Sequence, residues 1–201
     1  MQMLDPKLVF IRGNLEHGSN VLIETNVTFE GDVYLGNNVV IRANTIIRNS
    51  KIGSETEIKQ YSFINNSNIN EGCIVGPYAR LRTGSDINSN SQIGTYVEVK
   101  NSKIGSNCKI NHMAFIGDAI IEDNVIIGAG TITCNHDGKE TQQTIIKSGA
   151  YIGSNVNLIA PIEIGNNALI GAGSTVTKSA PNNKITIERA QQVSFDKKKR
   201  I

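Results

Sequence analysis

Aliphatic residues recur along this chain at a spacing of six, with occasional steps of five. The series runs from Ile23 to Ile127, stops over a polar segment, and resumes from Ile146 to Val176. It has 25 members, of which 24 are Ile, Leu or Val. A fixed period held over most of a chain is the signature of a repeat architecture. The anchor positions are Ile23, Phe29, Leu35, Ile41, Ile47, Ile52, Ile58, Ile64, Ile69, Val75, Leu81, Ile87, Ile93, Val99, Ile104, Ile110, Ile116, Ile121, Ile127, Ile146, Ile152, Leu158, Ile164, Ile170 and Val176.

A six-residue repeat has room for one short strand and one turn. A strand of about four residues cannot bury its apolar side alone. Three such strands can close a triangular coil, and stacked coils place each anchor above another, with backbone hydrogen bonds running between coils. Ile and Val suit this interior because their stiff, branched side chains stack well on a pleated surface. The pattern therefore predicts an all-β parallel β-helix of roughly eight coils, at three anchors per coil.

Breaks in the period divide the chain into segments. Residues 1–20 precede the regular repeat and are expected to cap the open end of the solenoid. The β-helix is expected over residues 21–179, with a polar loop ejected at about 133–144 (T-C-N-H-D-G-K-E-T-Q-Q-T). Ejected loops of solenoids often serve binding. Residues 180–201 are expected to form an arm that ends in a solvated basic tail, Lys197 to Arg200.

Composition removes several classes of function. Lys and Arg number 20 against 18 for Asp and Glu, so the net charge of +2 gives no reason to expect nucleic acid or an acidic membrane as partner. No stretch approaches the roughly 20 apolar residues that span a bilayer, and no signal peptide is visible, so the cytoplasm is the expected compartment. Cys73, Cys108 and Cys134 are far apart and form no C-x-x-C pair, and the few histidines are scattered, so no metal site is expected.

Several runs are specific enough to indicate a family. They are V-G-P-Y-A-R-L-R-T-G (75–84), V-E-V-K-N-S-K-I-G (97–105), N-H-M-A-F-I-G-D-A (111–119), I-G-A-G-T-I-T-C-N-H-D-G (127–138), I-G-S-N-V-N-L-I-A-P-I-E-I-G (152–165) and A-G-S-T-V-T-K-S-A-P (172–181). Together they resemble the C-terminal acetyltransferase domain of the bifunctional bacterial enzyme that makes UDP-N-acetylglucosamine. The resemblance covers about residues 3 to 189.

The resemblance carries expectations that periodicity alone does not. It implies a left-handed β-helix, a homotrimer, and acetyl-CoA as co-substrate. It also implies N-acetylation of glucosamine 1-phosphate, a step toward UDP-N-acetylglucosamine for peptidoglycan and lipopolysaccharide. The glycine-rich nucleotide-binding start of the family's uridyltransferase half is not found, so uridylyl transfer is not expected of this chain, and that domain or chain is expected elsewhere.

Acetylation of an amine requires a base that removes a proton, and histidine is best matched to this near neutral pH. His112 falls in the segment that resembles the family's base-carrying run, and it is our candidate general base. Glu98 matches a neighbouring family segment. A carboxylate there is expected to orient His112 and to stabilise its imidazolium form.

Further site residues follow from the resemblance position by position. Arg82 and Lys100 match the family's phosphate-contacting cations, Arg as a bidentate fork and Lys as a point charge. Phe115 stands where the family has a sugar-contacting Tyr. The positions that match acetyl-CoA contacts are Ala129, Asn135, His136, Ser154, Ala172 and Arg189, the last on an arm that in the family reaches a neighbouring subunit.

The chain departs from the family pattern at several sugar-contacting positions. Besides Phe115, Ile126 replaces an Asn, Thr141 replaces a Lys often present in the loop, and His136 replaces a Tyr. Each lost hydrogen bond to a polar ligand costs roughly 1–3 kcal/mol. Two alternatives therefore stay open, an acetyltransferase for another amino sugar or amine, and a non-catalytic trimeric scaffold.

Overall fold

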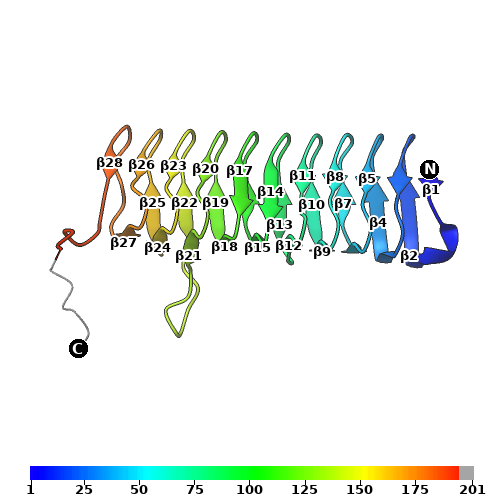
Figure 1. Cartoon of the computed structure of the whole chain (residues 1–201), viewed down its shortest axis with the longest axis horizontal. Helices are drawn as coiled ribbons and strands as arrows, with labels where there is room; N and C mark the ends of the chain where they lie inside the picture. Colours follow the sequence, from blue (N-terminus) through cyan, green and yellow to red (C-terminus); the bar gives the residue numbers. More distant parts are fainter. Residues whose placement is uncertain (195–201) are drawn as a thin grey trace, which may run out of the picture.

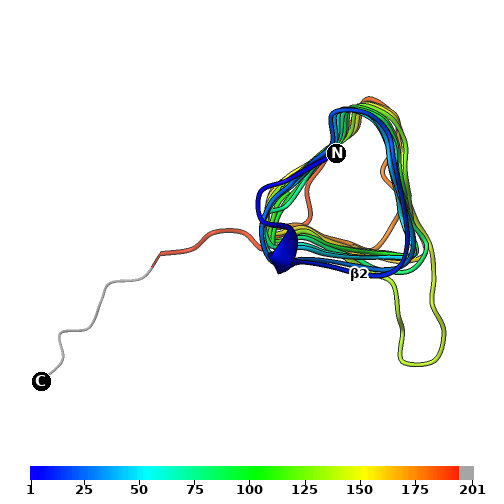
Figure 2. The ribbon, with the colours of Figure 1, turned by 90° about the vertical axis from the view of Figure 1, so that its right-hand side faces the viewer.

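Short parallel strands stack on three flat faces of a triangular prism (Figures 1 and 2). The structure, a computed structural model, describes residues 1–194. The predicted basic tail, Lys197 to Arg200, lies outside the described residues. The all-β repeat architecture expected from the sequence is confirmed. Among residues 1–194, no helix has the length and apolar character that crossing a membrane requires.

Each coil contributes one strand, or part of one, to each face. Face one consists of β1 (Gln2–Met3), β3 (Leu22–Ile23), β5 (Val40–Ile41), β8 (Glu57–Ile58), β11 (Ile74–Val75), β14 (Gln92–Thr95), β17 (Lys109–His112), β20 (Ile126–Ile127), β23 (Tyr151–Ile152), β26 (Leu169–Ile170) and β28 (Ile185–Thr186). Face two contains the first halves of β2 (Val9–His17) and β4 (Val27–Leu35), then β6 (Ile46–Arg48), β9 (Phe63–Asn65), β12 (Arg80–Leu81), β15 (Glu98–Lys100), β18 (Phe115–Gly117), β21 (Ile132–Cys134), β24 (Asn157–Ile159) and β27 (Thr175–Val176). Face three contains the second halves of β2 and β4, then β7 (Lys51–Ile52), β10 (Ser67–Ile69), β13 (Ser85–Ile87), β16 (Lys103–Ile104), β19 (Ala119–Ile121), β22 (Thr144–Ile146) and β25 (Ile162–Ile164).

The coil is left-handed. In Figure 2 the N-terminal end faces the viewer, and the chain passes from β1 through the short 3-10 helix η1 (Pro6–Leu8) into β2. It continues anticlockwise as it recedes, which is the sense of a left-handed coil. Connections between parallel strands are normally right-handed. This solenoid therefore has the handedness that the family resemblance implies and departs from the usual right-handed connection.

The anchors form the core of the prism. All 25 are buried, and none is more than 4% exposed. A second inner column, two residues before each anchor, carries small side chains such as Ser85, Ser91 and Ala114. The hydroxyl of Ser91 donates to the carbonyl of Gly105 at 2.7 Å, so polar residues are accommodated inside because their hydroxyls bond the backbone of the next coil.

The corners explain why the chain is rich in asparagine. Residues 1–194 contain 19 non-glycine residues with positive φ, and 13 of them are Asn. Asn tolerates the left-handed conformation better than most residues because its short side chain can bond locally. We call the corner between faces one and two the first corner, that between faces two and three the second corner, and the remaining one the third.

The solenoid is longer than the anchors predicted. Eleven strands stack on face one, which makes about ten coils rather than eight. Residues 1–20 form a coil of their own, with β1 paired to β3 and β2 to β4. Beyond residue 179, β28 pairs with β26. The two end segments therefore extend the repeat, and a capping role for residues 1–20 stays a prediction.

The ejected loop leaves at the second corner. It connects β21 to β22, so its free part is residues 135–143, slightly shorter than the predicted 133–144. Figure 2 shows it projecting away from the prism as a narrow, hairpin-shaped loop. An isolated bridge between His136 and Thr141 closes it.

Candidate active site

His112 ends β17 on face one and stands at the first corner. The next residue, Met113, turns the chain with a φ of 45°. The register pairs His112 with Thr95 of the coil before. The imidazole is exposed and forms no hydrogen bond with other residues of the described chain. A free imidazole at a corner is available to a substrate from outside.

Three of the predicted acetyl-CoA positions continue the same corner, one coil apart each. The amide of Gly130 donates to Met113 O at 3.1 Å, Asn155 N to Ala129 O at 2.7 Å, and Gly173 N to Ser154 O at 2.8 Å. These bonds join successive coils and stack the three positions, Ala129, Ser154 and Ala172, in line with His112.

The C-terminal segment returns to this line. The guanidinium of Arg189 donates from Nη1 to the carbonyl of Ala172 at 3.0 Å. Beside the line, Gly128 comes so close to the next coil that a Cβ atom would lie 2.5 Å from Ser154 N. Small residues and backbone therefore form the corner surface from His112 to Arg189, and the structure brings these five predicted residues together.

The other two predicted positions, Asn135 and His136, lie at the base of the loop on the second corner. Asn135 is 8% exposed, and its side-chain amide donates to the carboxylate of Asp118. His136 Nδ1 accepts from the amide of Gly138 at 3.0 Å. Hydrogen bonds from the amides of Glu140 and Lys139 lower the pKa of Asp137. The loop thus has its own internal hydrogen bonds.

Arg82 and Lys100 lie on face two in a shallow hollow of about 280 Å³. The carboxylate of Glu98 accepts from Arg82 Nη1 at 2.9 Å and from Arg80 Nη1 at 3.4 Å. Glu98 thus balances part of this cation cluster, and a role in orienting His112 stays a prediction. Phe115 lies beside Glu98 in the next coil.

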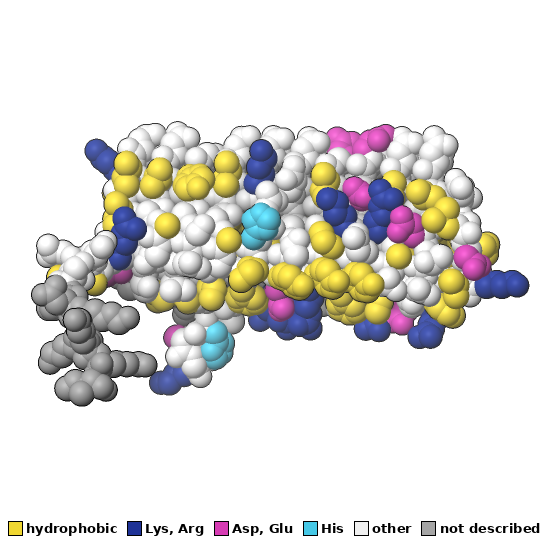
Figure 3. All heavy atoms as spheres, viewed as in Figure 1, with side chains coloured by type: hydrophobic (Ala, Val, Ile, Leu, Met, Phe, Trp, Pro, Cys, Tyr) yellow, Lys and Arg dark blue, Asp and Glu magenta, His cyan; other side chains and the backbone are white. Residues whose placement is uncertain are grey.

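His112 and the loop lie at opposite edges of face two. Asp118, which anchors the loop, is six positions after His112. A strand rises about 3.3 Å per residue, so the span is on the order of 20 Å. A single chain therefore brings the corner residues together but leaves the loop residues apart from His112. Figure 3 shows one histidine on the body of the prism and another on the loop.

Asp118 is a residue that the sequence analysis missed. Its carboxylate accepts from Asn101 Nδ2 at 2.6 Å and from Asn135, and it lies 3.8 Å from Lys100 Nζ. It therefore ties the base of the loop to the cations of face two. The signal available in the sequence was its place in the matched run 111–119, and the structure puts it at a corner with a φ of 50°, which Asp tolerates.

We expect Asp118→Ala to loosen the loop. Losing the acceptor of a buried amide costs about 1–3 kcal/mol, so local opening should become roughly 5- to 150-fold more frequent. Tryptic cleavage after Lys139 measures this directly. Asp118→Asn should fall between wild type and alanine because its amide oxygen still accepts. The control Asp86→Ala, on face three, should cleave like wild type, and equal rates for all four proteins would contradict the anchoring role.

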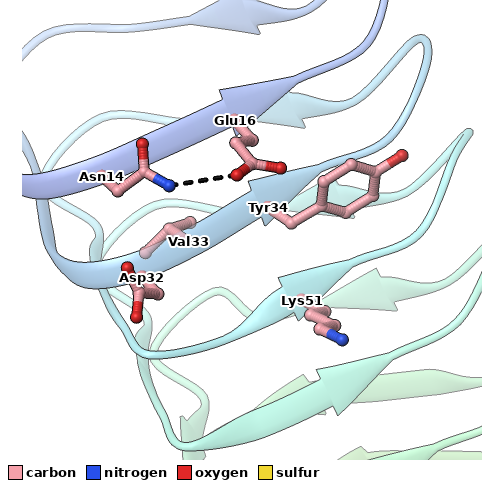
Figure 4. A pocket seen from close by; sticks show the side chains of 6 residues that line it. All are labelled: Asn14, Glu16, Asp32, Val33, Tyr34 and Lys51. Carbon is pink, nitrogen blue, oxygen red and sulfur yellow. Dashed lines mark hydrogen bonds between the residues drawn. The ribbon is translucent and has the colours of Figure 1, made fainter.

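Two further features were not singled out from sequence. Tyr61, Tyr78 and Tyr96 stack along the first corner, with ring centroids 4.9 and 5.2 Å apart, and their spacing of 17 to 18 residues, one coil, is the signal that was available. A separate hollow of about 280 Å³ near the N-terminal end includes Tyr34 and Lys51 (Figure 4). It lies on face three and contains none of the predicted site residues. Within residues 1–194, no three metal-binding side chains gather at one point.

The chain is similar in sequence to a family of bacterial transferases and to several curated proteins. The family model described as bacterial transferase hexapeptide (six repeats) matches residues 14–49 and 143–178. The bifunctional protein GlmU of Janthinobacterium sp. (strain Marseille) is 45% identical over 194 residues, which cover 96% of this chain and 43% of GlmU. GlmU of Baumannia cicadellinicola subsp. Homalodisca coagulata is 48% identical over 188 residues, covering 94% of this chain and 40% of that protein. The chain is a relative of the C-terminal hexapeptide-repeat domain of GlmU.

The relationship to GlmU confirms the family resemblance seen in the sequence. The chain spans less than half the length of the GlmU proteins that it matches. Among solved structures, the UDP-N-acetylglucosamine acyltransferase of Francisella novicida superposes with a TM-score of 0.60 at 17% identity, over 93% of this chain and 67% of that one. At this identity the likeness concerns the fold, and it agrees with the hexapeptide solenoid described above.

Proposed function

We propose that this chain transfers the acetyl group of acetyl-CoA to the amino group of glucosamine 1-phosphate. The observation that carries the proposal is the line of His112, Ala129, Ser154 and Ala172 along the first corner, with Arg189 bonded at its end. The relationship to GlmU supports this reaction. The product would enter the synthesis of UDP-N-acetylglucosamine.

In this proposal acetyl-CoA supplies an activated thioester carbonyl. Ala129 and Ala172 offer small side chains, so the pantetheine arm can lie close to the backbone. Ser154 offers one hydroxyl to hydrogen-bond that arm, and Arg189 offers a guanidinium for a phosphate of CoA. The fixed spacing of the coils would hold the thioester end beside His112.

His112 would act as general base. Its imidazole is exposed and is not engaged by other described residues, so one ring nitrogen can accept a proton from the acceptor's nitrogen. The amine, neutral after losing its ammonium proton to solvent, would attack the thioester carbonyl while His112 takes the proton that the nitrogen must lose, and backbone amides near Ala129 would stabilise the oxyanion that develops. The proton held by His112 would be available to the departing CoA sulfur.

The loop and the cation cluster would complete the site from a neighbouring copy. In one chain, Asn135 and His136, at the foot of the loop, lie on the order of 20 Å from His112 along face two. A homotrimer, as the family resemblance implies, would place the second corner of one subunit against the first corner of the next. Arg82 and Lys100 would then approach the phosphate of the acceptor, and Phe115 would offer an apolar contact to the sugar.

One observation favours a second candidate, an acetyltransferase for a different amino sugar. Ile126, which is 40% exposed, stacks along face one with Tyr151 and Leu169 of the next two coils, which are 46% and 37% exposed. This apolar stripe runs beside the proposed acetyl-CoA line. An acceptor with an apolar substituent would bury part of it, at about 25 cal/mol per Å².

A panel of acceptors separates these candidates. Purified chain and acetyl-CoA would be incubated with glucosamine 1-phosphate, glucosamine, and other amino sugars, and release of free CoA thiol would be followed. The highest kcat/KM is expected with glucosamine 1-phosphate. A clear preference for another amine would replace the acceptor in the proposal. No release with any amine, together with no saturable binding of acetyl-CoA, would favour the non-catalytic scaffold.

A further inference from the structure

A hollow of about 430 Å³ lies on face three, on the side toward the third corner. Its lining includes Tyr34, Lys51, Asn68 and Asp86, which stand in register on four successive coils. It shares the first two with the hollow of Figure 4. None of the four is a candidate residue of the acetyltransferase site. The volume is that of an ordinary small-molecule site.

Glycines keep the floor of this hollow low. Gly36 and Gly53 occupy the position directly after the anchor in two successive coils. A Cβ atom at Gly36 would lie 2.6 Å from Ser54 N, and one at Gly53 would lie 2.5 Å from the carbonyl carbon of Asn70. Side chains are therefore excluded at both places, and a ligand in the hollow would rest against bare backbone.

The polar side chains beside this floor are unengaged. Lys51, Asn68 and Asp86 form no side-chain hydrogen bond or ion pair within the described part of the chain. Lys51 and Asp86 stand two coils apart, about 10 Å at the spacing of neighbouring strands, with Asn68 between them. They are too far apart to pair directly, so an ammonium donor and a carboxylate acceptor both remain available to a ligand.

An unpartnered aromatic ring ends the hollow. Tyr61, Tyr78 and Tyr96 stack on one another along the first corner. Tyr34 is 45% exposed, and within residues 1–194 its ring stacks on no other aromatic ring. A free aromatic face next to polar groups offers an apolar platform to a ligand whose edges are polar.

We propose that this hollow is a second, non-catalytic site that binds a neutral saccharide, independently of the proposed acetyl transfer. Sugar hydroxyls both donate and accept, so they match the mixture of Lys51, Asn68 and Asp86. A phosphate would meet the carboxylate of Asp86, and an ammonium group would meet Lys51, so an uncharged ligand fits best. The apolar face of one sugar ring would lie on Tyr34.

The dimensions suit a disaccharide. Tyr34 and Asp86 stand three coil steps apart, about 14 Å at the spacing of neighbouring strands, which is longer than one pyranose ring. The hollow also lies away from the first and second corners, which the proposed homotrimer would bring together. A ligand bound there would therefore leave the acetyl-CoA line and the loop free.

Titration of the 15N-labelled chain with cellobiose, followed by NMR of the backbone amides, tests the site. The amides of Gly53 and Asn68 should shift and saturate, while that of His112 should not move. Two charged probes, the disaccharide of glucosamine and glucose 6-phosphate, should shift the same amides with lower affinity. Each brings a charge of the same sign as one of the two charged side chains of the hollow.

Variants assign the binding to the hollow. Tyr34→Ala should weaken cellobiose binding roughly 3- to 10-fold, as expected for the loss of one aromatic contact. The matched control is Tyr151→Ala, which removes a tyrosine that is 46% exposed on face one, and it should bind like wild type. Lys51→Met removes a donor and should weaken binding by a similar factor.

The inference would be overturned by equal affinity of wild type and Tyr34→Ala for cellobiose, or by shifts confined to the surroundings of His112. Tighter binding of either charged probe at the hollow would reject a neutral ligand, and the absence of any saturable shift would reject the site. Cellobiose has no amino group and the titration contains no acetyl-CoA. A failure of the proposed acetyl transfer would therefore leave this test unaffected.

Discussion

Replacing His112 with alanine is expected to lower kcat for acetyl transfer roughly 100- to 10,000-fold, the usual contribution of a positioned general base. KM for acetyl-CoA should change little, because the residues proposed to hold it lie in later coils of the first corner. The exposed position of His112 means that the substitution creates no cavity and leaves no buried partner. The fold should therefore survive intact.

The matched control for this experiment is His17→Ala. His17 is also exposed, but it lies in the first coil and bonds only the carbonyl of Gly18, at 2.8 Å. Its kcat should equal that of wild type. Circular dichroism of both variants would verify the solenoid. An unchanged kcat in His112→Ala would remove this residue from the mechanism.

Replacing Ile127 with alanine is expected to destabilise the solenoid by about 2–5 kcal/mol, as for other buried aliphatic residues truncated to Ala. Ile127 is an anchor and is 4% exposed. Its neighbours in the column are Ile110 and Ile152, which are fully buried. Truncation would leave a gap in the aliphatic column that these stiff side chains cannot fill.

The same strand provides the control. Ile126 precedes Ile127 in β20 but points outward and is 40% exposed. Ile126→Ala should change the free energy of unfolding by no more than about 0.5 kcal/mol. Urea denaturation followed by circular dichroism measures both. Equal midpoints for the two variants would contradict the assignment of inner and outer positions along the strand.

The middle of the solenoid could be predicted from the sequence because every coil there requires an apolar residue at the anchor position. An anchor inside the stack has a coil above and below it, so its side chain is buried. The end coils lack one neighbour, so polar residues are tolerated at the equivalent positions. His17 stands in register with the anchor Leu35, and Thr186 with Ile170. Polar residues at these two places interrupt the period, which is why about eight coils were expected and about ten are observed.

The candidate site could be predicted only in part. Stacking by coils follows from the period, so the alignment of His112 with Ala129 and Ser154 is a consequence of register. The pairing of Glu98 with Arg80 and Arg82 is a contact between coils on another face, and sequence matching had suggested a different partner for it. Asp118 lies in the matched run 111–119, but the match gave it no role. Its partners Asn101 and Asn135 are each 17 residues away along the chain, a separation that local pattern does not specify.

The transfer itself is best tested with acetyl-CoA that carries a 13C label in the acetyl group. The purified chain would be mixed with this donor and glucosamine 1-phosphate, and the label would be followed by NMR. The account predicts that the thioester acetyl signal decays while an amide acetyl signal on the sugar grows at the same rate. A label that stays on CoA, or that appears only as free acetate, would contradict the central claim that this solenoid is an amino-sugar acetyltransferase.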